Sequence, residues 1–285
     1  MISSSELIYL REIAEELATD GAEFILASSR QCFARDDQSF VQTKSSRTDP
    51  VTRLDRETEQ RLRRRLASIR PEDAILGEEG GGVPNSDTLT WIIDPIDGTV
   101  NFLYGIPAYT VSVAALLHGH IVVGAVADVV HGHLYSAALG LGAYQRCSTQ
   151  QIPLQCSTTQ DLTVALCGTG FGYSASRRVA QSQLLTKIIA HVRDIRRLGS
   201  AALDLCMVAC GKLDLYYEHG IKIWDYAAGV LIAAEAGAYV HTPSNLLALS
   251  DDAALVVASA PGVSQEFMSL LDQYHGLAIL PTKLQ

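Results

Sequence analysis

The sequence lacks an excess of basic residues. It has 22 Lys and Arg against 31 Asp and Glu, which gives a formal net charge of −9 at pH 7, and it has no basic tail. This balance does not support binding to nucleic acid or to an anionic membrane, because both attract clustered Lys and Arg. An acidic protein can still hold an anionic substrate where metal ions supply positive charge locally.

Long apolar runs are also missing. No segment approaches the roughly 20 consecutive apolar residues that a membrane-spanning helix needs. The opening segment, MISSSELIYLREIAEEL, has acidic residues where a secretory signal needs basic ones, and its apolar residues follow helical spacing. We therefore expect a cytoplasmic protein with no membrane partner.

Close cysteine pairs are a third absence. The chain has no CxxC pair and no close Cys/His cluster among its six cysteines, which are Cys32, Cys147, Cys156, Cys167, Cys206 and Cys210. We expect reduced, mostly buried thiols, as in a cytoplasmic protein.

The bulk composition is that of a globular protein. Hydrophobic residues make up 48% and charged residues 19% of the 285 residues, and there are no repeats or low-complexity tracts. A chain of this length can bury a large core. We predict one domain over residues 1–285, built from two packed lobes that meet near residue 145.

Hydrophobic spacing predicts the secondary structure. The first half should contain helices over 4–33 and 52–68, a polar loop over 35–50, and strands over 109–117, 120–129 and 133–138. The second half should contain helices over 182–192, 200–211, 225–236 and 261–273, and strands over 193–197, 213–217, 238–241 and 254–259. This order indicates an antiparallel-rich first half joined to an α/β second half.

Three conspicuous motifs have ordinary explanations. HGH at 118–120 and at 131–133 has Gly between two strands, which favours tight hairpin turns over a zinc site. CGTGFGY has Tyr173 where the dinucleotide fingerprint needs its third Gly, so we interpret it as a strand exit. RLRRRL at 61–66 is typical of a solvated basic helix face.

The segment WIIDPIDGTVNFLYG is the most informative part of the chain. An apolar strand runs into Asp94 and Asp97, where buried carboxylates are costly without a partner. Pro95 fixes the backbone between them, Gly98 allows a sharp turn, and Thr99 offers a hydroxyl at an expected helix start.

Further acids point to the same chemistry. Glu78 and Glu79 follow a second apolar approach in AILGEEGGG, Asp55 lies in DPVTRLD, and Asp225 opens a helix in KIWDYAAG. Oxygen ligands without nearby His or Cys favour Mg²⁺ or Mn²⁺ over zinc. Several carboxylates imply more than one ion, and paired ions suit hydrolysis of a phosphate ester, one activating water and another stabilising the leaving oxygen. The amides of the Gly-Thr turn would add donors for phosphate.

Two other interpretations of DPIDGT stay open at this point. Asp, Gly and Thr are common turn formers, so the motif alone also fits a surface turn, although the other acidic motifs favour a site. A haloacid-dehalogenase-type phosphatase uses an aspartyl nucleophile in D-x-D-x-T. Here the acids are one residue too far apart, and with Asp97 as the second acid the nucleophile position is Pro95. Direct attack by water is therefore expected.

The chain resembles the inositol monophosphatase family over nearly its whole length. WIIDPIDGTVNF and IWDYAAGVLIAAEAGA resemble the two family signatures, and GEEGGG and KSSRTDPVTRLD match in order and approximate spacing. PIDGTVNFLYGIP and RRLGSAALDLC are especially similar to bacterial members. The resemblance implies a mixed α/β fold, the layered α-β-α-β-α sandwich of the inositol monophosphatase and fructose-1,6-bisphosphatase type.

The resemblance also implies roles for individual residues. Glu78, Asp94 and the carbonyl of Ile96 would hold one Mg²⁺, and Asp94, Asp97 and Asp225 a second, with Glu78 helping a weaker third. Thr99, oriented by Asp55, would position the attacking water, and the amides of Gly98 and Thr99 would bind phosphate. The positions that match inositol contacts are Gly199, Ser200, Ala201 and Glu218, and Lys44 matches a mobile-loop lysine near the metals. The plainer alternatives are an N-cap role for Asp225 and a solvated lysine at 44.

We therefore expect a Mg²⁺-dependent, lithium-sensitive phosphatase of myo-inositol monophosphate, which the resemblance implies is a homodimer. Other substrates of the superfamily remain alternatives: fructose 1,6-bisphosphate, 3'-phosphoadenosine 5'-phosphate, histidinol phosphate and NADP. A non-enzymatic alternative is a transcription-associated regulator, as some bacterial relatives are. The complete set of acids and the missing basic surface favour the enzyme.

Overall fold

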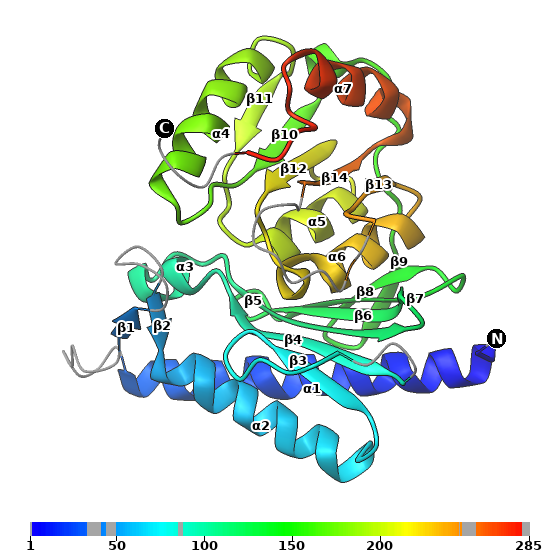
Figure 1. The fold of residues 1–285 in the computed structure, drawn as a ribbon. Coiled ribbons are helices and arrows are strands. Elements are labelled where there is room, and N and C mark those ends of the chain that lie inside the picture. Colours follow the sequence, from blue (N-terminus) through cyan, green and yellow to red (C-terminus); the bar gives the residue numbers. More distant parts are fainter. Residues whose placement is uncertain are drawn as a thin grey trace.

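The computed structural model describes residues 2–32, 41–43, 50–84, 88–244, 246 and 255–280. These residues form stacked layers of helices and sheets (Figure 1). Helices α1 (Ser4–Cys32) and α2 (Arg53–Ile69) cover one face of a seven-stranded sheet. Helices α5 (Ala201–Ala209) and α6 (Ile223–Glu235) separate it from a five-stranded sheet, whose outer face is covered by α4 (Ala175–Ile188) and α7 (Pro261–Gln273). The expected α-β-α-β-α sandwich is confirmed.

The larger sheet has the order β3-β4-β5-β6-β7-β8-β9. Its strands are β3 (Ala74–Gly77), β4 (Thr90–Asp97), β5 (Thr110–Leu117), β6 (His120–Asp128), β7 (His133–Ala138), β8 (Ala143–Cys147) and β9 (Gln150–Pro153). Only β3 and β4 pair in parallel, and the other neighbours are antiparallel. The carboxyl ends of β3 and β4 therefore lie side by side, which brings GEE next to DPID.

The smaller sheet has the order β11-β10-β12-β14-β13. Its strands are β10 (Leu166–Thr169), β11 (Asp194–Arg196), β12 (Leu215–His219), β13 (Tyr239–His241) and β14 (Leu255–Ser259). β10 pairs in parallel with β11 and β12, whereas β14 is antiparallel to both its neighbours. Short elements complete the fold: β1 (Val41–Thr43) paired with β2 (Pro50–Thr52), α3 (Thr99–Tyr104) and a 3₁₀ turn (Leu162–Val164).

The core explains the different character of the helices. α5 and α6 are apolar on nearly all sides because one buried cluster joins them to both sheets. α2 instead buries a single stripe that includes Leu54, Leu62 and Leu66, and its other face is polar. The middle helices thus pack against both sheets. The seven-stranded sheet continues to Pro153, beyond the expected boundary near 145.

The bounds of most predicted elements are confirmed within a few residues, and the bounds of one helix are wrong. The helix expected over 182–192 is α4, which begins seven residues earlier and ends at Ile188. Its first turn, Ala175–Arg178, has no apolar periodicity to reveal it. The exposed strand β9 was not predicted because its side chains face solvent and alternate only weakly.

The interpretation of the two HGH segments as hairpin turns is confirmed. Both HGH segments are hairpin turns, with Gly119 at φ 79° and Gly132 at φ 67°.

The cysteines whose side chains the structure describes are free thiols, and three of them are buried. Within the described residues no helix has the length and apolar character needed to cross a membrane.

Candidate metal and phosphate site

The site begins where β4 ends. All eight residues of TWIIDPID are buried, and the pairing register of β4 with β5 shifts between Asp94 and Asp97. This irregularity takes the two acids out of the regular alternation of a strand. The N–H of Ile96 donates to Asp94 Oδ1 at 3.0 Å, which fixes the carboxylate in the bend.

Three carboxylates from two distant parts of the chain meet at this point. One oxygen from each of Asp94, Asp97 and Asp225 lies within 4.8 Å of the others. Asp225 comes from the first turn of α6, where its Oδ2 accepts the N–H of Lys222 at 2.6 Å. Asp225 is not the N-cap of α6, because Lys222 occupies that position, but it does cap the helix as the N3 acid of a capping box.

Glu78 faces the same cavity from the end of β3. Its N–H donates to the carbonyl of Ile93 at 3.1 Å, which ties the GEE loop to the strand carrying Asp94. The cavity has a volume of about 550 Å³ and is lined by Glu78, Asp94, Asp97 and Asp225 together with the Gly98–Thr99 turn.

The acids destabilise one another when all are charged. The pKa of Asp94 is raised well above its usual range by burial and then by the charges of Glu78, Asp97 and Asp225. Burial raises the pKa of Asp97 to about 6, although hydrogen bonds from Ser200 and Ala202 oppose the shift. The pKa of Asp225 is likewise raised, first by burial. Buried, repelling carboxylates of this kind either take up protons or are balanced by a bound cation.

Thr99 and Asp55 also lie together. Thr99 Oγ1 is 3.2 Å from Asp55 Oδ1 and 3.0 Å from the carbonyl of Ile96, so its proton can be donated to either acceptor. Asp55 belongs to α2 and is fully buried. Gly98 has φ 97°, and a Cβ there would lie 2.9 Å from the carbonyl of Ala108, so this turn requires glycine.

The same cavity contains most of the predicted inositol contacts. Gly199, Ala201 and Glu218 line the cavity. Ser200 is buried behind Asp97, where its hydroxyl donates to Asp97 Oδ2 at 2.6 Å and accepts from the N–H of Leu203. The structure therefore places Ser200 as a support for Asp97 and as the N-cap of α5. Lys44 lies outside the described residues.

Sequence reasoning missed the surroundings of Glu218. The Tyr216 hydroxyl donates to its Oε2 at 2.7 Å, and a Cβ on Gly170 would lie 1.8 Å from the same oxygen. Burial raises the pKa of Glu218 to about 7, against the effects of Tyr216 and Arg197. CGTGFGY is thus a strand exit whose Gly170 leaves room for Glu218. The alternation of β12 would have revealed Tyr216, two residues away on the same face.

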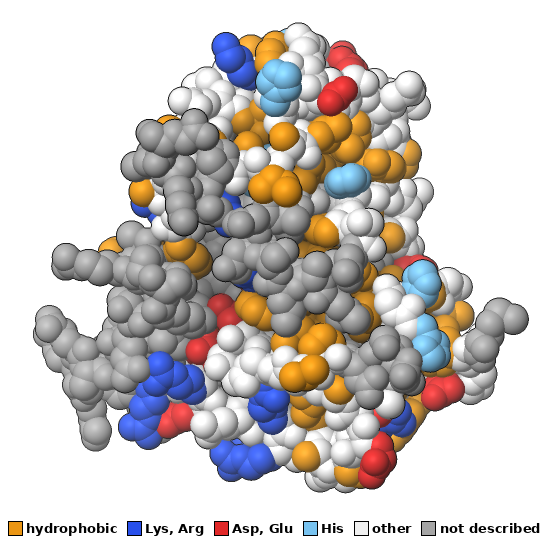
Figure 2. Space-filling model, viewed as in Figure 1, with side chains coloured by type: hydrophobic (Ala, Val, Ile, Leu, Met, Phe, Trp, Pro, Cys, Tyr) orange, Lys and Arg blue, Asp and Glu red, His pale blue; other side chains and the backbone are white. Residues whose placement is uncertain are grey.

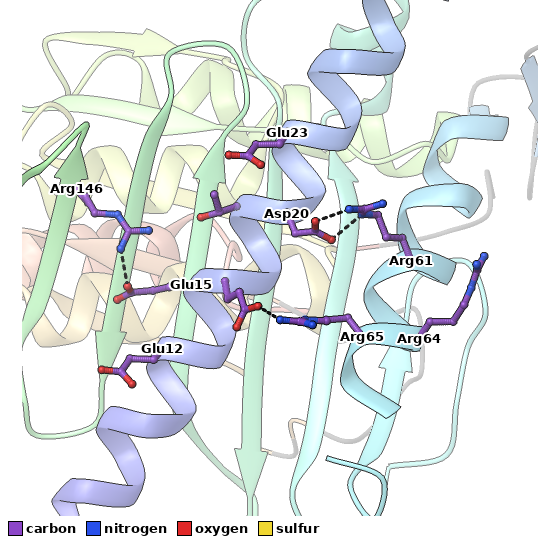
Figure 3. Close-up of a pocket in the computed structure, with 10 residues that line it drawn as sticks. Glu12, Glu15, Asp20, Glu23, Arg61, Arg64, Arg65 and Arg146 are labelled. Carbon is purple, nitrogen blue, oxygen red and sulfur yellow. Dashed lines mark hydrogen bonds and ion pairs between the residues drawn. The ribbon is translucent and has the colours of Figure 1, made fainter. Parts of the chain in front are cut away.

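A second hollow, between α1, α2 and β8, has a volume of about 780 Å³ and contains paired charges (Figure 3). Arg61 donates to both oxygens of Asp20 at 2.7 and 2.6 Å, Arg65 pairs with Glu16, and Arg146 pairs with Glu15 at 3.1 Å. The RLRRRL face is therefore solvated, as predicted, and partly neutralised. On the face that Figure 2 shows, basic side chains near the bottom of the molecule lie among acidic ones.

Comparisons with known proteins agree with this geometry. The family described as "Inositol monophosphatase family" matches residues 6–274. The chain is 53% identical to "Inositol-1-monophosphatase" of Mycobacterium leprae, covering 94% of this chain and 95% of that protein. It is 38% identical to "Nus factor SuhB" of Pasteurella multocida, covering 70% and 73%.

Solved structures show the same similarity. "Mycobacterium tuberculosis SuhB" superposes with a TM-score of 0.82 at 48% identity, covering 95% of this chain and 98% of that one. "Thermotoga maritima IMPase TM1415" superposes with a TM-score of 0.78 at 25% identity, covering 93% and 97%. With the family match over most of its length and relatives above half identity, the chain belongs to the inositol monophosphatase family.

Proposed function

We propose that the protein is a Mg²⁺-dependent phosphomonoesterase that hydrolyses myo-inositol monophosphate to inositol and phosphate. The main support is the convergence of Asp94, Asp97 and Asp225 within 4.8 Å at the wall of one cavity. Relatives named inositol-1-monophosphatase, at 51–53% identity, support the substrate.

The residues fit a hard divalent cation. All the candidate ligands are oxygens, they are largely buried, and burial together with the neighbouring acids raises the pKa values of Asp94 and Asp225. Asp94, Asp97 and Asp225 would hold one Mg²⁺, and Glu78, Asp94 and the Ile96 carbonyl another, with a third near Glu78; Mn²⁺ has the same ligand preference. The ions would supply positive charge for the phosphate and generate a nucleophile at neutral pH.

The chain's own residues orient water and substrate. When Thr99 Oγ1 donates a hydrogen bond to Asp55 or to the Ile96 carbonyl, its lone pairs are free to accept a hydrogen bond from a water molecule in the cavity. The N–H groups of Gly98 and Thr99 would bind phosphate oxygens. Glu218, held by Tyr216, would accept a hydroxyl of the sugar alcohol, and Gly199 and Ala201 leave space beside it.

Water attack predicts that no phosphoenzyme forms. Quenching the protein during turnover of ³²P-labelled inositol 1-phosphate should leave no acid-stable, hydroxylamine-sensitive label on the chain. Such label would favour an aspartyl nucleophile and contradict the proposed mechanism.

The substrate is tested with a panel of phosphate esters assayed in Mg²⁺. Inositol 1-phosphate should give a higher kcat/KM than fructose 1,6-bisphosphate, 3'-phosphoadenosine 5'-phosphate, histidinol phosphate or NADP. A higher value for another member of the panel would reassign the substrate while leaving the metal site intact. Hydrolysis of none of them would contradict the proposed function.

A second candidate function follows from one comparison. Relatives named "Nus factor SuhB" are 36–39% identical to this chain over about 70% of its length, which supports a role in transcription complexes. Co-purification with RNA polymerase and its elongation factors would support it.

Size-exclusion chromatography with light scattering tests the expected homodimer. A cytoplasmic location remains a prediction.

A further inference from the structure

The loop that follows β3 is held by a buried carboxylate from α2. Glu59 is only 2% exposed, and its two oxygens accept the N–H groups of Glu79 at 2.7 Å and Gly80 at 2.8 Å. Arg63, one turn further along α2, donates to Glu59 Oε1 at 2.6 Å and to the carbonyl of Gly81. The charge of Glu59 is thus neutralised by Arg63 and used to bind one short stretch of backbone.

The glycines of GEEGGG make room for this carboxylate. A Cβ on Gly77 would lie 2.4 Å from Glu59 Oε1, and a Cβ on Gly80 would lie 2.7 Å from it. Both distances are shorter than real carbon–oxygen contacts, so a side chain at either position would displace Glu59. In the sequence these glycines suggest flexibility, whereas in the structure they let the loop pack closely against α2.

Glu78 therefore lies between two anchors. On one side its own N–H is bonded to the carbonyl of Ile93, the residue before Asp94, and on the other side the next two N–H groups are bonded to Glu59. Glu59 does not line the cavity and is not part of the carboxylate cluster. Its effect on the site must pass through the backbone of the Glu78 loop.

We propose that Glu59, supported by Arg63, is a positioning residue that fixes the Glu78 carboxylate relative to Asp94 and thereby sets the affinity of the site for its divalent cation. This inference rests on the proposed function, because it requires Glu78 to be a metal ligand. A buried ion pair contributes little net stability compared with packed apolar side chains. Holding a ligand in place is a benefit that an apolar pair would not provide.

The test is Glu59→Gln, which keeps the size of the side chain and replaces one acceptor oxygen by an NH₂ group that cannot accept the loop N–H. Mg²⁺ and Mn²⁺ binding is measured by titration calorimetry without substrate, and the Mg²⁺ dependence of turnover is measured separately. We expect the Kd for the cation to rise about tenfold, the lower end of the usual effect of groups that orient metal ligands. At saturating Mg²⁺, kcat should return close to the parental value.

The matched control is Glu57→Gln on the same helix. Glu57 also forms an i,i+4 pair with an arginine, Arg53, at 2.5 Å, but among the described residues no hydrogen bond joins it to the Glu78 loop. Loss of the Glu57 charge should leave the Kd for the cation unchanged. Arg63→Lys is a milder second variant, because a lysine cannot bridge Glu59 and Gly81 in the way a guanidinium does. Arg63→Lys should also raise the Kd for the cation, and it serves as the test if Glu59→Gln does not fold.

The outcomes separate the inference from the proposed function. If the parent binds no Mg²⁺, the proposed function fails. If the parent binds Mg²⁺ and the folded Glu59 or Arg63 variants bind it equally well, with only a lower melting temperature, Glu59 is a structural residue and the inference is wrong.

Discussion

At Asp97, two hydrogen bonds and several like charges act on one carboxyl group. Ser200 Oγ and the N–H of Ala202 both donate to the same oxygen, Oδ2, at 2.6 and 2.7 Å. One oxygen of this carboxyl group also lies within 4.8 Å of a carboxylate oxygen of Asp94 and of Asp225. Because hydrogen bonds hold this carboxyl group in place while neighbouring charges repel it, Asp97 is the best residue at which to separate a metal site from a structural turn.

Asp97→Asn should keep the fold and lose the function. The amide oxygen can accept both hydrogen bonds, while one of the repelling charges is removed, so the metal-free variant should melt at or above the parental temperature. Activity at saturating Mg²⁺ should fall by at least about a hundredfold, as when other groups that stabilise transition-state charge are lost. Parental turnover by this variant, measured beside its melting curve in EDTA, would contradict the metal-site assignment.

Glu218 gives a prediction about pH. Its folded-state pKa of about 7 lies above the ordinary value of 4.5, so the folded state binds the proton more tightly. The resulting stability is fully present below pH 4.5 and is lost as pH rises through 7. In EDTA, Glu218→Gln should therefore gain stability relative to the parent between these pH values, because Gln never ionises.

Urea unfolding of both proteins at pH 4.5 and pH 8 measures this difference. Tyr216→Phe is a useful companion variant, since it removes the hydrogen bond to Glu218 and leaves the carboxyl in place. A stability difference between parent and Glu218→Gln that does not change with pH would mean that Glu218 keeps an ordinary pKa.

Individual site residues could be predicted from the sequence when their chemistry is unusual in its surroundings. Asp94 and Asp97 interrupt an apolar strand, so their presence needs a reason. Glu59 could not be recognised in the same way, because an acid beside Arg63 on a helix is typical of an exposed pair. Its role depends on contact with Gly77 and Gly80, which only the folded chain shows.

At the scale of elements, the hollow between α1, α2 and β8 contains ion pairs whose residues do not line the candidate site. The Asp20–Arg61 pair is bidentate but half-exposed, with side-chain exposures of 29% and 50%. Exposed pairs contribute at most about 1 kcal/mol and are screened by salt. We therefore regard the ion pairs of this hollow as structural.

Asp20→Asn tests that view. The variant should lose at most about 1 kcal/mol of unfolding free energy at low salt. The difference from the parent should shrink in 1 M NaCl, and kcat/KM should not change. These values come from urea unfolding at two salt concentrations and from a standard phosphatase assay. A large loss of activity with intact stability would instead show that the hollow in Figure 3 takes part in function.

Helices and strands could be predicted where burial of one face gives the sequence a regular hydrophobic spacing. Which strands pair with one another could not be predicted. The long apolar run of β4 and the helical spacing of α2 are visible along the chain, whereas the first turn of α4 has no such pattern. The parallel pairing of β3 with β4 is equally hidden, because periodicity does not record which strand lies beside which. That pairing is what places Glu78 next to Asp94.

At the scale of the whole molecule, the candidate site joins three layers. Asp94 and Asp97 end a strand of the seven-stranded sheet, Asp225 begins a middle helix, and Glu218 ends a strand of the five-stranded sheet. A cation bound among these acids would remove their mutual repulsion and connect the layers. Binding should therefore stabilise the whole fold.

Removing metal should consequently change both activity and stability. Protein stripped with EDTA should be inactive and should recover with Mg²⁺ or Mn²⁺, while Ca²⁺, which prefers longer bonds and looser coordination, should inhibit. A cation present at 100 times its Kd adds about 2.7 kcal/mol per site to the folded state. Mg²⁺ should thus raise the melting temperature of the parent in a concentration-dependent way and raise that of Asp97→Asn much less, because this variant no longer supplies the charge that the cation neutralises. Full activity in stripped protein, or an equal Mg²⁺ shift in both proteins, would place the cation somewhere other than the Asp94–Asp97–Asp225 cluster.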